Sequence, residues 1–248
     1  RREGLIDLEN RLGKRSGAFC TFFPDEPRAA ILCNSVGDSD DVRTLLHEMG
    51  HAFQKWESMP IEMVTLQSPT SETAEIHSMG MEYLSLPLIE AFFEPENASR
   101  FRSGRWKKTI NLLCYASTVD EFQHWVYDNP DATPDERDVA WCRIWDEYQP
   151  VVDYGDRDDL KSARWYQQQH IFQAPFYYID YAIAETVAMQ LAALDRRDHE
   201  KAMATYLELC RLGGTKSILD VVNAVGLRSP FDPQVMKDMM VVAVEASS

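Results

Sequence analysis

Two histidines four residues apart carry the clearest chemistry in the sequence. The stretch "TLLHEMGHAFQKW" contains His47 and His51, with Glu48 directly after the first of them. Residues four apart project from one face of an α-helix, so both imidazoles can reach one metal ion. Neutral imidazoles at this spacing suit zinc. Glu48 is then placed to act as a general base, which takes a proton from a metal-activated water molecule and passes it to the leaving amine.

The residues around the histidine pair predict a capped helix. Serine and aspartate residues precede an apolar-periodic run, which places the helix start near Ser39 to Asp41. Gly50 stands in the middle of this helix, where glycine costs about 1 kcal/mol relative to alanine. A glycine in that place indicates that another part of the molecule approaches the helix closely.

A catalytic zinc site needs a third protein ligand, and the next predicted helix offers three carboxylates. Glu72, Glu75 and Glu82 lie in one stripe of "SETAEIHSMGMEYL", and the spacing alone leaves the choice among them open. Glu75 has small and apolar neighbours, as a ligand facing a buried helix should. Glu72 and Glu82 could accept hydrogen bonds from the outer nitrogens of the histidines, or could belong to a solvated face. His77 projects elsewhere and is predicted to be a partly buried helical residue.

The remaining elements indicate a mainly α fold with a small β element. Two short apolar runs in "GAFCTFFPDEPRAAILCN" flank a turn at residues 24–27 and predict a β-hairpin before the histidine helix. Apolar residues at spacings of three and four predict long helices over residues 106–128, 134–149, 175–197 and 200–212. The breaks between them are typical of loops, so we expect one domain over residues 1–248.

Composition narrows the classes of partner. The formal net charge of −15 argues against a nucleic-acid partner, because phosphate binding depends on clustered lysine and arginine. No apolar run of about 18 residues predicts a membrane span, and no secretory signal opens the chain. The five cysteines are odd in number and widely spaced, which favours a reducing, cytoplasmic setting over a disulfide framework. Peptides or small molecules fit this composition better as substrates.

The sequence resembles the oligoendopeptidase F and thimet oligopeptidase superfamily of zinc metallopeptidases. "HEMGH" matches the family signature H-E-x-G-H, and "AEIHSMGMEYL" places Glu75 24 residues after the second histidine, where the family has its third ligand. Upstream, "GKRSGAFCTF" is similar to the strand and turn that precede the zinc helix. The resemblance implies a multi-helical zincin-type catalytic domain that binds one zinc ion through His47, His51 and Glu75.

A second segment, "HIFQAPFYYIDYAIAE", resembles the histidine and tyrosine segment of the family. The resemblance implies that His170, Tyr178 and Tyr181 hold the substrate carbonyl as it becomes an oxyanion, with Tyr177 as a further substrate contact. Phenol hydroxyls aimed at developing charge can lower a barrier by several kcal/mol. Without the family, the spacing of Tyr178 and Tyr181 on one helical face would favour an aromatic core stripe.

The resemblance also implies an endopeptidase that cleaves internal bonds of oligopeptides. The strand beginning at Gly17 and Ala18 is expected to pair with an extended substrate. Family members carry an additional helical N-terminal region, so we expect this chain to be the C-terminal part of a longer polypeptide whose missing region completes the cleft.

The sequence leaves two alternatives to the endopeptidase open. A related H-E-x-x-H carboxypeptidase would need a cation for the terminal carboxylate, for which Arg143 and Arg164 are available. A non-catalytic helical binding domain could keep a metal for structure alone. Glu48 argues against the second alternative, because a structural site has no need of that carboxylate.

Overall fold

The computed structural model describes residues 4–23 and 28–247, and the chain divides into two compact units. The first unit comprises residues 1–106 and 184–248, and the second comprises residues 107–183. Two long helices, α3 (Pro95–Asp128) and α7 (Ile179–Asp195), contribute residues to both units. The turn predicted at residues 24–27 lies outside the described residues.

A three-stranded sheet opens the first unit. Its strands are β1 (Ile6–Glu9), β2 (Phe19–Phe23) and β3 (Arg28–Ser35), in the order β1-β3-β2. β2 and β3 form the predicted antiparallel hairpin, with Cys20 opposite Ile31. β1 runs parallel to β3 on the other side. The central strand therefore lies between two neighbours, and β2 has a strand partner on one side only among the described residues.

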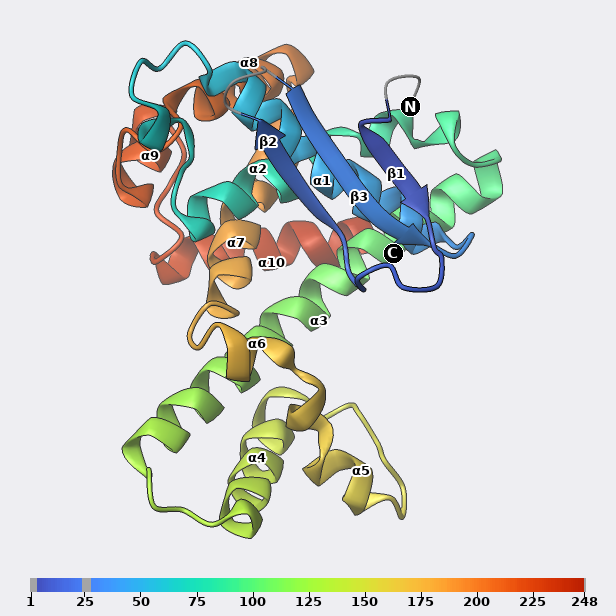
Figure 1. The fold of residues 1–248 in the computed structure, drawn as a ribbon, viewed down its shortest axis with the longest axis vertical. Coiled ribbons are helices and arrows are strands. Elements are labelled where there is room, and N and C mark those ends of the chain that lie inside the picture. The colour runs from blue at the N-terminus through green and yellow to red at the C-terminus, as the bar shows by residue number, and fades with distance from the viewer. Residues whose placement is uncertain (1–3, 24–27, 248) are drawn as a thin grey trace. The chain divides into compact units, whose positions relative to one another are not determined.

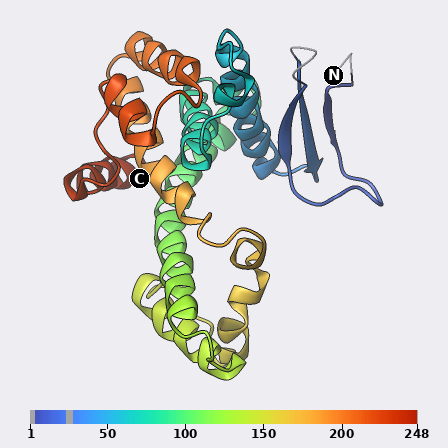
Figure 2. The same ribbon diagram turned by 60° about the vertical axis from the view of Figure 1, so that its left-hand side comes forward.

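One helix joins the sheet to the other helices of this unit. α1 (Ser39–Ser58) contacts β3 and β2 with one face and α2 (Ser71–Leu84) with another, as Figures 1 and 2 show. α1 begins with a capping box in which Asp38 accepts from the backbone N–H of Asp41, and the Asp41 carboxylate accepts from the backbone N–H of Asp38. The cap fixes the start of the helix that carries both histidines.

Further helices of the first unit pack on α1 and α2. α8 (His199–Leu212) packs on both of them and buries Tyr206 and Leu209 completely. In the N-terminal half of α1, Leu46 packs in a small cluster with Ile89 and Ala98. The elements, in chain order, are η1 (Val64–Gln67), η2 (Leu86–Ala91), α8 (His199–Leu212), α9 (Ile218–Ala224) and α10 (Pro233–Ser247).

The second unit has an aromatic core of its own. Phe122 and Trp141 are completely buried, and their rings meet edge to face with centroids 5.1 Å apart. Tyr115, Trp145 and Trp165 complete the same cluster. The elements of this unit, besides the parts of α3 and α7, are α4 (Pro134–Tyr148), α5 (Asp158–Ser162), η3 (Arg164–Gln167) and α6 (Gln169–Gln173).

The mainly α fold with a small sheet is confirmed, and three details differ from the sequence-based expectation. The sheet gains β1, whose four residues "IDLE" pair only with a strand far along the chain. α3 begins at Pro95 rather than near residue 106, because its first turns are polar. α7 begins at Ile179 rather than near residue 175, because Phe176 has a left-handed backbone with φ of 63°. No helix in the described part of the chain is long and apolar enough to cross a membrane.

Candidate metal centre

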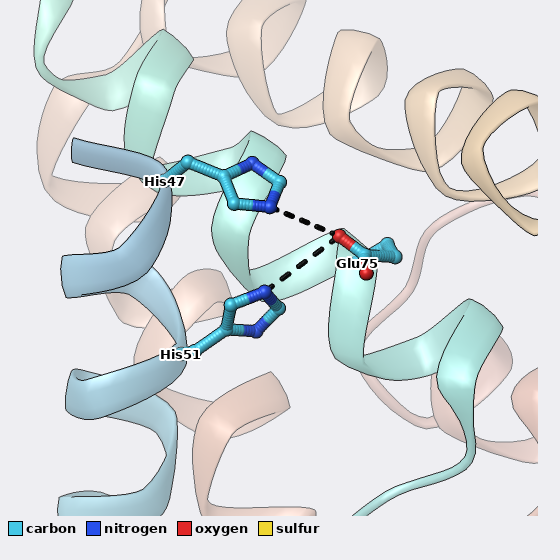
Figure 3. A group of neighbouring side chains, drawn as sticks. All are labelled: His47, His51 and Glu75. Carbon is cyan, nitrogen blue, oxygen red and sulfur yellow. Dashed lines mark ion pairs between the residues drawn. The ribbon is translucent and has the colours of Figure 1, made fainter. Parts of the chain in front are cut away.

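Three side chains from two helices converge at the contact between α1 and α2. His47 and His51 project from one face of α1 toward Glu75 on α2, as Figure 3 shows. The Glu75 Oε2 atom lies 3.2 Å from His47 Nε2 and 3.7 Å from His51 Nε2. One ligand atom of each residue lies within 4.8 Å of the others. The two imidazoles and the carboxylate therefore surround one common point.

These separations fit a zinc ion. Ligand atoms about 2.0–2.2 Å from a tetrahedral zinc lie roughly 3.3–3.6 Å from one another. The measured 3.2 and 3.7 Å are close to this range. Two imidazole nitrogens and one carboxylate oxygen are also the donor set of catalytic zinc sites, in which a fourth position stays open. The residues present thus match the metal in both geometry and chemistry.

The backbones of α1 and α2 come into direct contact at Gly50. A Cβ atom at this position would lie 2.6 Å from the His77 carbonyl oxygen and 2.6 Å from Ser78 Cα. Both distances are shorter than van der Waals contact, so only glycine fits. Gly50 precedes His51 directly, and Ser78 lies one turn after Glu75. The close approach predicted from the mid-helix glycine is therefore the contact that sets the distance between the ligands.

Glu48 lies on the side of α1 that faces the sheet. Its side chain is buried, and its carboxylate accepts a hydrogen bond from the backbone of Cys20 on β2. Burial raises the pKa of Glu48 above its ordinary value, and the negative charge of Glu75 adds to this effect. A carboxylate with a raised pKa accepts a proton more readily at neutral pH, which is what a general base requires.

The two histidines differ in protonation when no metal is bound. Burial alone lowers the pKa of His47, but hydrogen bonds to Glu75 and Glu82 outweigh burial and raise it to about 10. Burial lowers the pKa of His51 to about 4, because it outweighs the negative charge of Glu75, which raises this pKa. His51 is therefore neutral at pH 7, and His47 must lose a proton before its Nε2 atom can bind a metal.

The carboxylates predicted to lie behind the ligands have different surroundings. Glu82 Oε1 lies 2.8 Å from His47 Nδ1, the nitrogen that points away from Glu75. Burial alone would raise the pKa of Glu82. The positive charge of Arg105 and the hydrogen bond with His47 outweigh burial and lower this pKa. The structure does not bring Glu72 to either histidine, because its carboxylate turns back to accept a hydrogen bond from the Thr70 hydroxyl at the start of α2.

His77 is completely buried rather than partly exposed as expected. It lies on the side of α2 that faces α8, where the Tyr206 hydroxyl donates to its backbone carbonyl oxygen over 2.8 Å. Burial lowers the pKa of His77 to about 4, so its imidazole is neutral. His77 is therefore part of the packing between these helices.

In the second unit, the predicted histidine and tyrosine segment forms one aromatic cluster. The His170 ring lies 5.7 Å from the Tyr177 ring, 5.1 Å from Tyr178 and 5.8 Å from Tyr181, measured between centroids. Burial raises the pKa of Tyr178 to about 12, so its hydroxyl keeps its proton at neutral pH and can donate a hydrogen bond. The structure thus brings these four side chains together. That they face the metal ligands remains a prediction.

Phe176 holds the turn that leads into this cluster. It is the only residue other than glycine with a positive φ among the described residues, an arrangement that costs free energy in any residue with a Cβ atom. Its backbone N–H donates to Gln123 Oε1 over 2.9 Å. Its ring lies 5.0 Å from the rings of both His124 and Tyr127. These contacts on α3 stabilise the strained turn directly before Tyr177 and Tyr178.

The comparison with protein families identifies the class of protein. The family model described as peptidase family M3 matches residues 1–241. The chain belongs to peptidase family M3. This is a family of metallopeptidases, and the cluster of His47, His51 and Glu75 has the residue types and spacing that can hold a metal ion.

Known M3 proteins are similar to the chain over almost all of its length. The structure of PZ peptidase A with an inhibitor has 38% sequence identity and a TM-score of 0.91, covering 98% of this chain and 44% of that one. An oligoendopeptidase F homolog from Borreliella burgdorferi is 23% identical over 234 residues, 91% of this chain. Another from Lactococcus lactis is 23% identical over 90% of this chain. The chain spans only 39% and 37% of the length of these two curated relatives.

Some contacts of the candidate metal centre were not predicted from the sequence. Ser78 donates from its hydroxyl to Glu75 Oε2 over 2.9 Å, and a serine three residues after a helical glutamate is a signal that could have revealed this contact. Arg105 forms an ion pair with Glu82 over 2.8 Å from a different helix. No local spacing connects these two residues, so the sequence offered no sign of their contact.

The arginines considered for a carboxypeptidase have partners within the second unit of the M3 chain. The guanidinium of Arg164 lies over the Tyr115 ring, 5.2 Å from its centroid, and donates to Gln167 Oε1 over 3.3 Å. Arg143 forms an ion pair with Glu121, with their charged atoms 3.9 Å apart. Each arginine thus has a structural contact that accounts for its position.

Proposed function

We propose that this M3 chain is the catalytic part of a zinc-dependent endopeptidase that hydrolyses internal bonds of oligopeptides. The observation that carries the proposal is the convergence of His47 Nε2, His51 Nε2 and Glu75 Oε2 on one point. When zinc is bound there, it supplies a Lewis acid that activates water at neutral pH and polarises a carbonyl group. The names of the oligoendopeptidase F relatives support oligopeptides as the substrate class.

In this mechanism, Glu48 moves the proton. Its buried carboxylate has a raised pKa and is not one of the three converging ligands, so it is available as a base. It would accept a proton from the attacking water and donate it to the nitrogen of the leaving amine. His170, Tyr178 and Tyr181 would donate hydrogen bonds to the substrate oxygen as it gains negative charge, with Tyr177 beside them.

An extended peptide would lie along the free edge of β2. β2 pairs with β3 on one side only in the described part of the sheet, so its other side can accept a peptide strand. Gly17 and Ala18 lead directly into this strand, and the Gly17 carbonyl oxygen is held by Asn34 Nδ2 over 2.7 Å. Because Glu48 accepts from the backbone of Cys20, the proposed base adjoins this edge. In the longer relatives, additional chain would supply the other wall of the cleft.

The test combines zinc content with turnover of an internally quenched peptide whose C-terminus is blocked. The wild type is expected to hold about one zinc per chain and to cleave the blocked peptide. His47→Ala should lose both properties. Glu48→Gln should keep the zinc and lose turnover by about 100-fold or more, the contribution of a general base.

Two results would contradict the proposal. Wild-type turnover in Glu48→Gln would show that the carboxylate moves no proton and that the metal has a different role. Release of single residues from a free C-terminus, with no cleavage of the blocked peptide, would favour the carboxypeptidase.

A further inference from the structure

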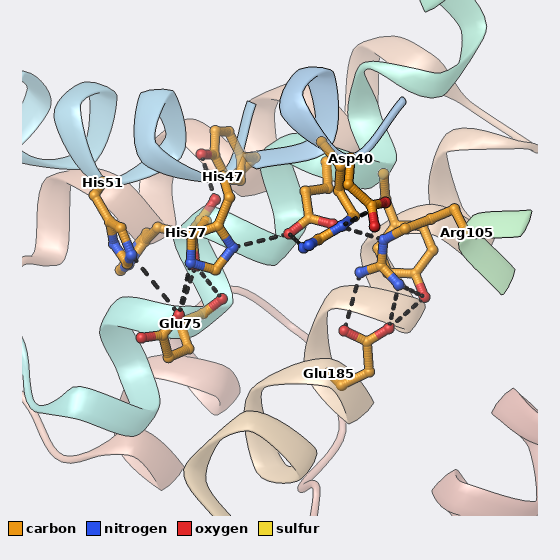
Figure 4. A network of polar contacts seen from close by, with 12 residues as sticks. Asp40, His47, His51, Glu75, His77, Arg105 and Glu185 are labelled. Carbon is orange, nitrogen blue, oxygen red and sulfur yellow. Dashed lines mark hydrogen bonds and ion pairs between the residues drawn. The ribbon is translucent and has the colours of Figure 1, made fainter. Parts of the chain in front are cut away.

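A buried chain of charged side chains continues from the candidate metal centre to other helices of the first unit. It runs from His47 through Glu82 and Arg105 to Glu185. Figure 4 labels His47, Arg105 and Glu185 in this network. The last three side chains are at most 5% exposed. They come from α2, α3 and α7, so no local sequence interaction explains the arrangement.

Arg105 is held on every side of its guanidinium group. Its Nε atom lies 2.8 Å from Glu82 Oε2, and its two terminal nitrogens lie 2.9 and 3.0 Å from the two oxygens of Glu185. The Tyr83 ring lies beneath the group, 4.1 Å from the guanidinium carbon, and the Tyr83 hydroxyl donates to Glu185 over 2.5 Å. A planar fork fixed by two carboxylates and an aromatic ring has one orientation only.

The two carboxylate oxygens of Glu82 contact different residues. Oε1 lies 2.8 Å from His47 Nδ1, and Oε2 lies 2.8 Å from Arg105 Nε. If the carboxylate turned away from either partner, it would also lose the other. The fixed arginine therefore sets the direction in which Glu82 presents Oε1 to the histidine.

We propose that Arg105 is a positioning residue of the metal centre, which fixes Glu82 so that His47 donates from Nδ1 and keeps the Nε2 lone pair directed at the metal. A carboxylate behind a ligating histidine fixes its tautomer and ring orientation. Arg105 extends this arrangement by one further residue, toward α7. The inference rests on the proposed zinc site.

A purely structural role is the alternative, since Arg105 also joins α2, α3 and α7. Buried ion pairs contribute little to stability over well-packed apolar residues, so stability gives a weak reason for this arrangement. The two roles predict different measurements. A structural arginine affects the free energy of unfolding alone, whereas a positioning arginine also affects the affinity for zinc.

The experiment measures the dissociation constant for zinc by competition with a chelator, on the folded protein at constant pH. Arg105→Lys keeps the charge and removes the fork, and it is expected to weaken zinc binding by about 10-fold, as loss of an outer partner of a ligand does. Glu82→Gln provides the reference and should weaken binding at least as much.

Arg102→Lys is the matched control. Arg102 also lies on α3, and its replacement by lysine removes a guanidinium group in the same way. Its partners, however, are the Leu86 carbonyl oxygen and Glu90 instead of Glu82. Its zinc affinity is expected to equal that of the wild type. Added zinc should restore the turnover of Arg105→Lys, because the defect lies in metal binding.

An Arg105→Lys protein that binds zinc as tightly as the wild type would overturn the inference, while the proposed zinc site would stand. Absence of zinc binding in the wild type would instead overturn the proposed function and the inference together. If Arg105→Lys fails to fold, Glu185→Gln serves as the second variant, since it leaves one oxygen to accept from the arginine. It should weaken zinc binding several-fold, and an unchanged affinity would overturn the inference equally.

Discussion

Replacement of Gly50 by alanine tests whether backbone contact between α1 and α2 holds the ligands in place. The new Cβ atom would lie 2.6 Å from Ser78 Cα and 2.6 Å from the His77 carbonyl oxygen. Carbon atoms pack at about 3.5–4.0 Å, so the two helices must separate by about 1 Å. His51 follows Gly50 directly, and its Nε2 atom already lies 3.7 Å from Glu75 Oε2. The separation would pull these ligands apart.

The expected change in stability is opposite to the one that helix propensity predicts. Alanine in place of a helical glycine stabilises a helix by about 1 kcal/mol. Overpacking against rigid backbone costs about 1–3 kcal/mol. We therefore expect Gly50→Ala to lower the free energy of unfolding by up to about 2 kcal/mol. Zinc affinity should fall by about 10-fold or more, because ligand positions tolerate displacements of only about 0.2 Å.

Urea unfolding of the metal-free protein and chelator competition measure the two effects. Gly104→Ala is the matched control, because Gly104 also lies inside a helix, α3, and a Cβ atom there would meet open space. It should stabilise the protein by up to about 1 kcal/mol and leave zinc affinity unchanged. The reasoning is refuted if Gly50→Ala is as stable as the wild type or more stable, with unchanged affinity for zinc.

Two further predictions concern protonation and backbone strain. Without metal, the pKa of His47 is about 10, above its ordinary value of 6.5. The protonated imidazole with its glutamate partners therefore contributes fully to the stability of the fold below pH 6.5, and this contribution is lost as the pH rises through 10. Zinc binding at pH 8 should therefore release about one proton, measured by calorimetry in buffers of different ionisation enthalpy, and no release would contradict the assignment. At Phe176, φ of 63° predicts that Phe176→Gly is more stable than Phe176→Ala by about 1 kcal/mol. Urea unfolding that ranks alanine above glycine would contradict the strain.

The sequence predicted best what depends on neighbours along the chain. The spacing of His47 and His51 predicted a shared helix face, and α1 provides it. The apolar runs around residues 24–27 predicted the hairpin of β2 and β3. Gly50 predicted a close approach, although the approaching backbone of α2 could be identified only in the structure.

Contacts between segments far apart in the sequence could not be predicted from the sequence pattern. Glu75 and Glu82 lie in the same stripe of α2, and only the fold directs one toward Nε2 and the other toward Nδ1 of His47. The pairing of Arg105 with Glu185 joins residues 80 positions apart. β1 was missed for a similar reason, since a parallel partner leaves no turn beside it in the sequence.

One side of β2 has no strand partner among the described residues, and this has a consequence for the range of substrates. A peptide bound along that edge, as proposed above, would be held mainly through its own amide and carbonyl groups, which are the same in every sequence. Such binding favours peptides that can adopt an extended conformation and excludes folded chains. It discriminates little between different side chains. A protease built in this way would act on peptides of many sequences, and any preference at the cleaved bond would have to come from pockets beside the strand.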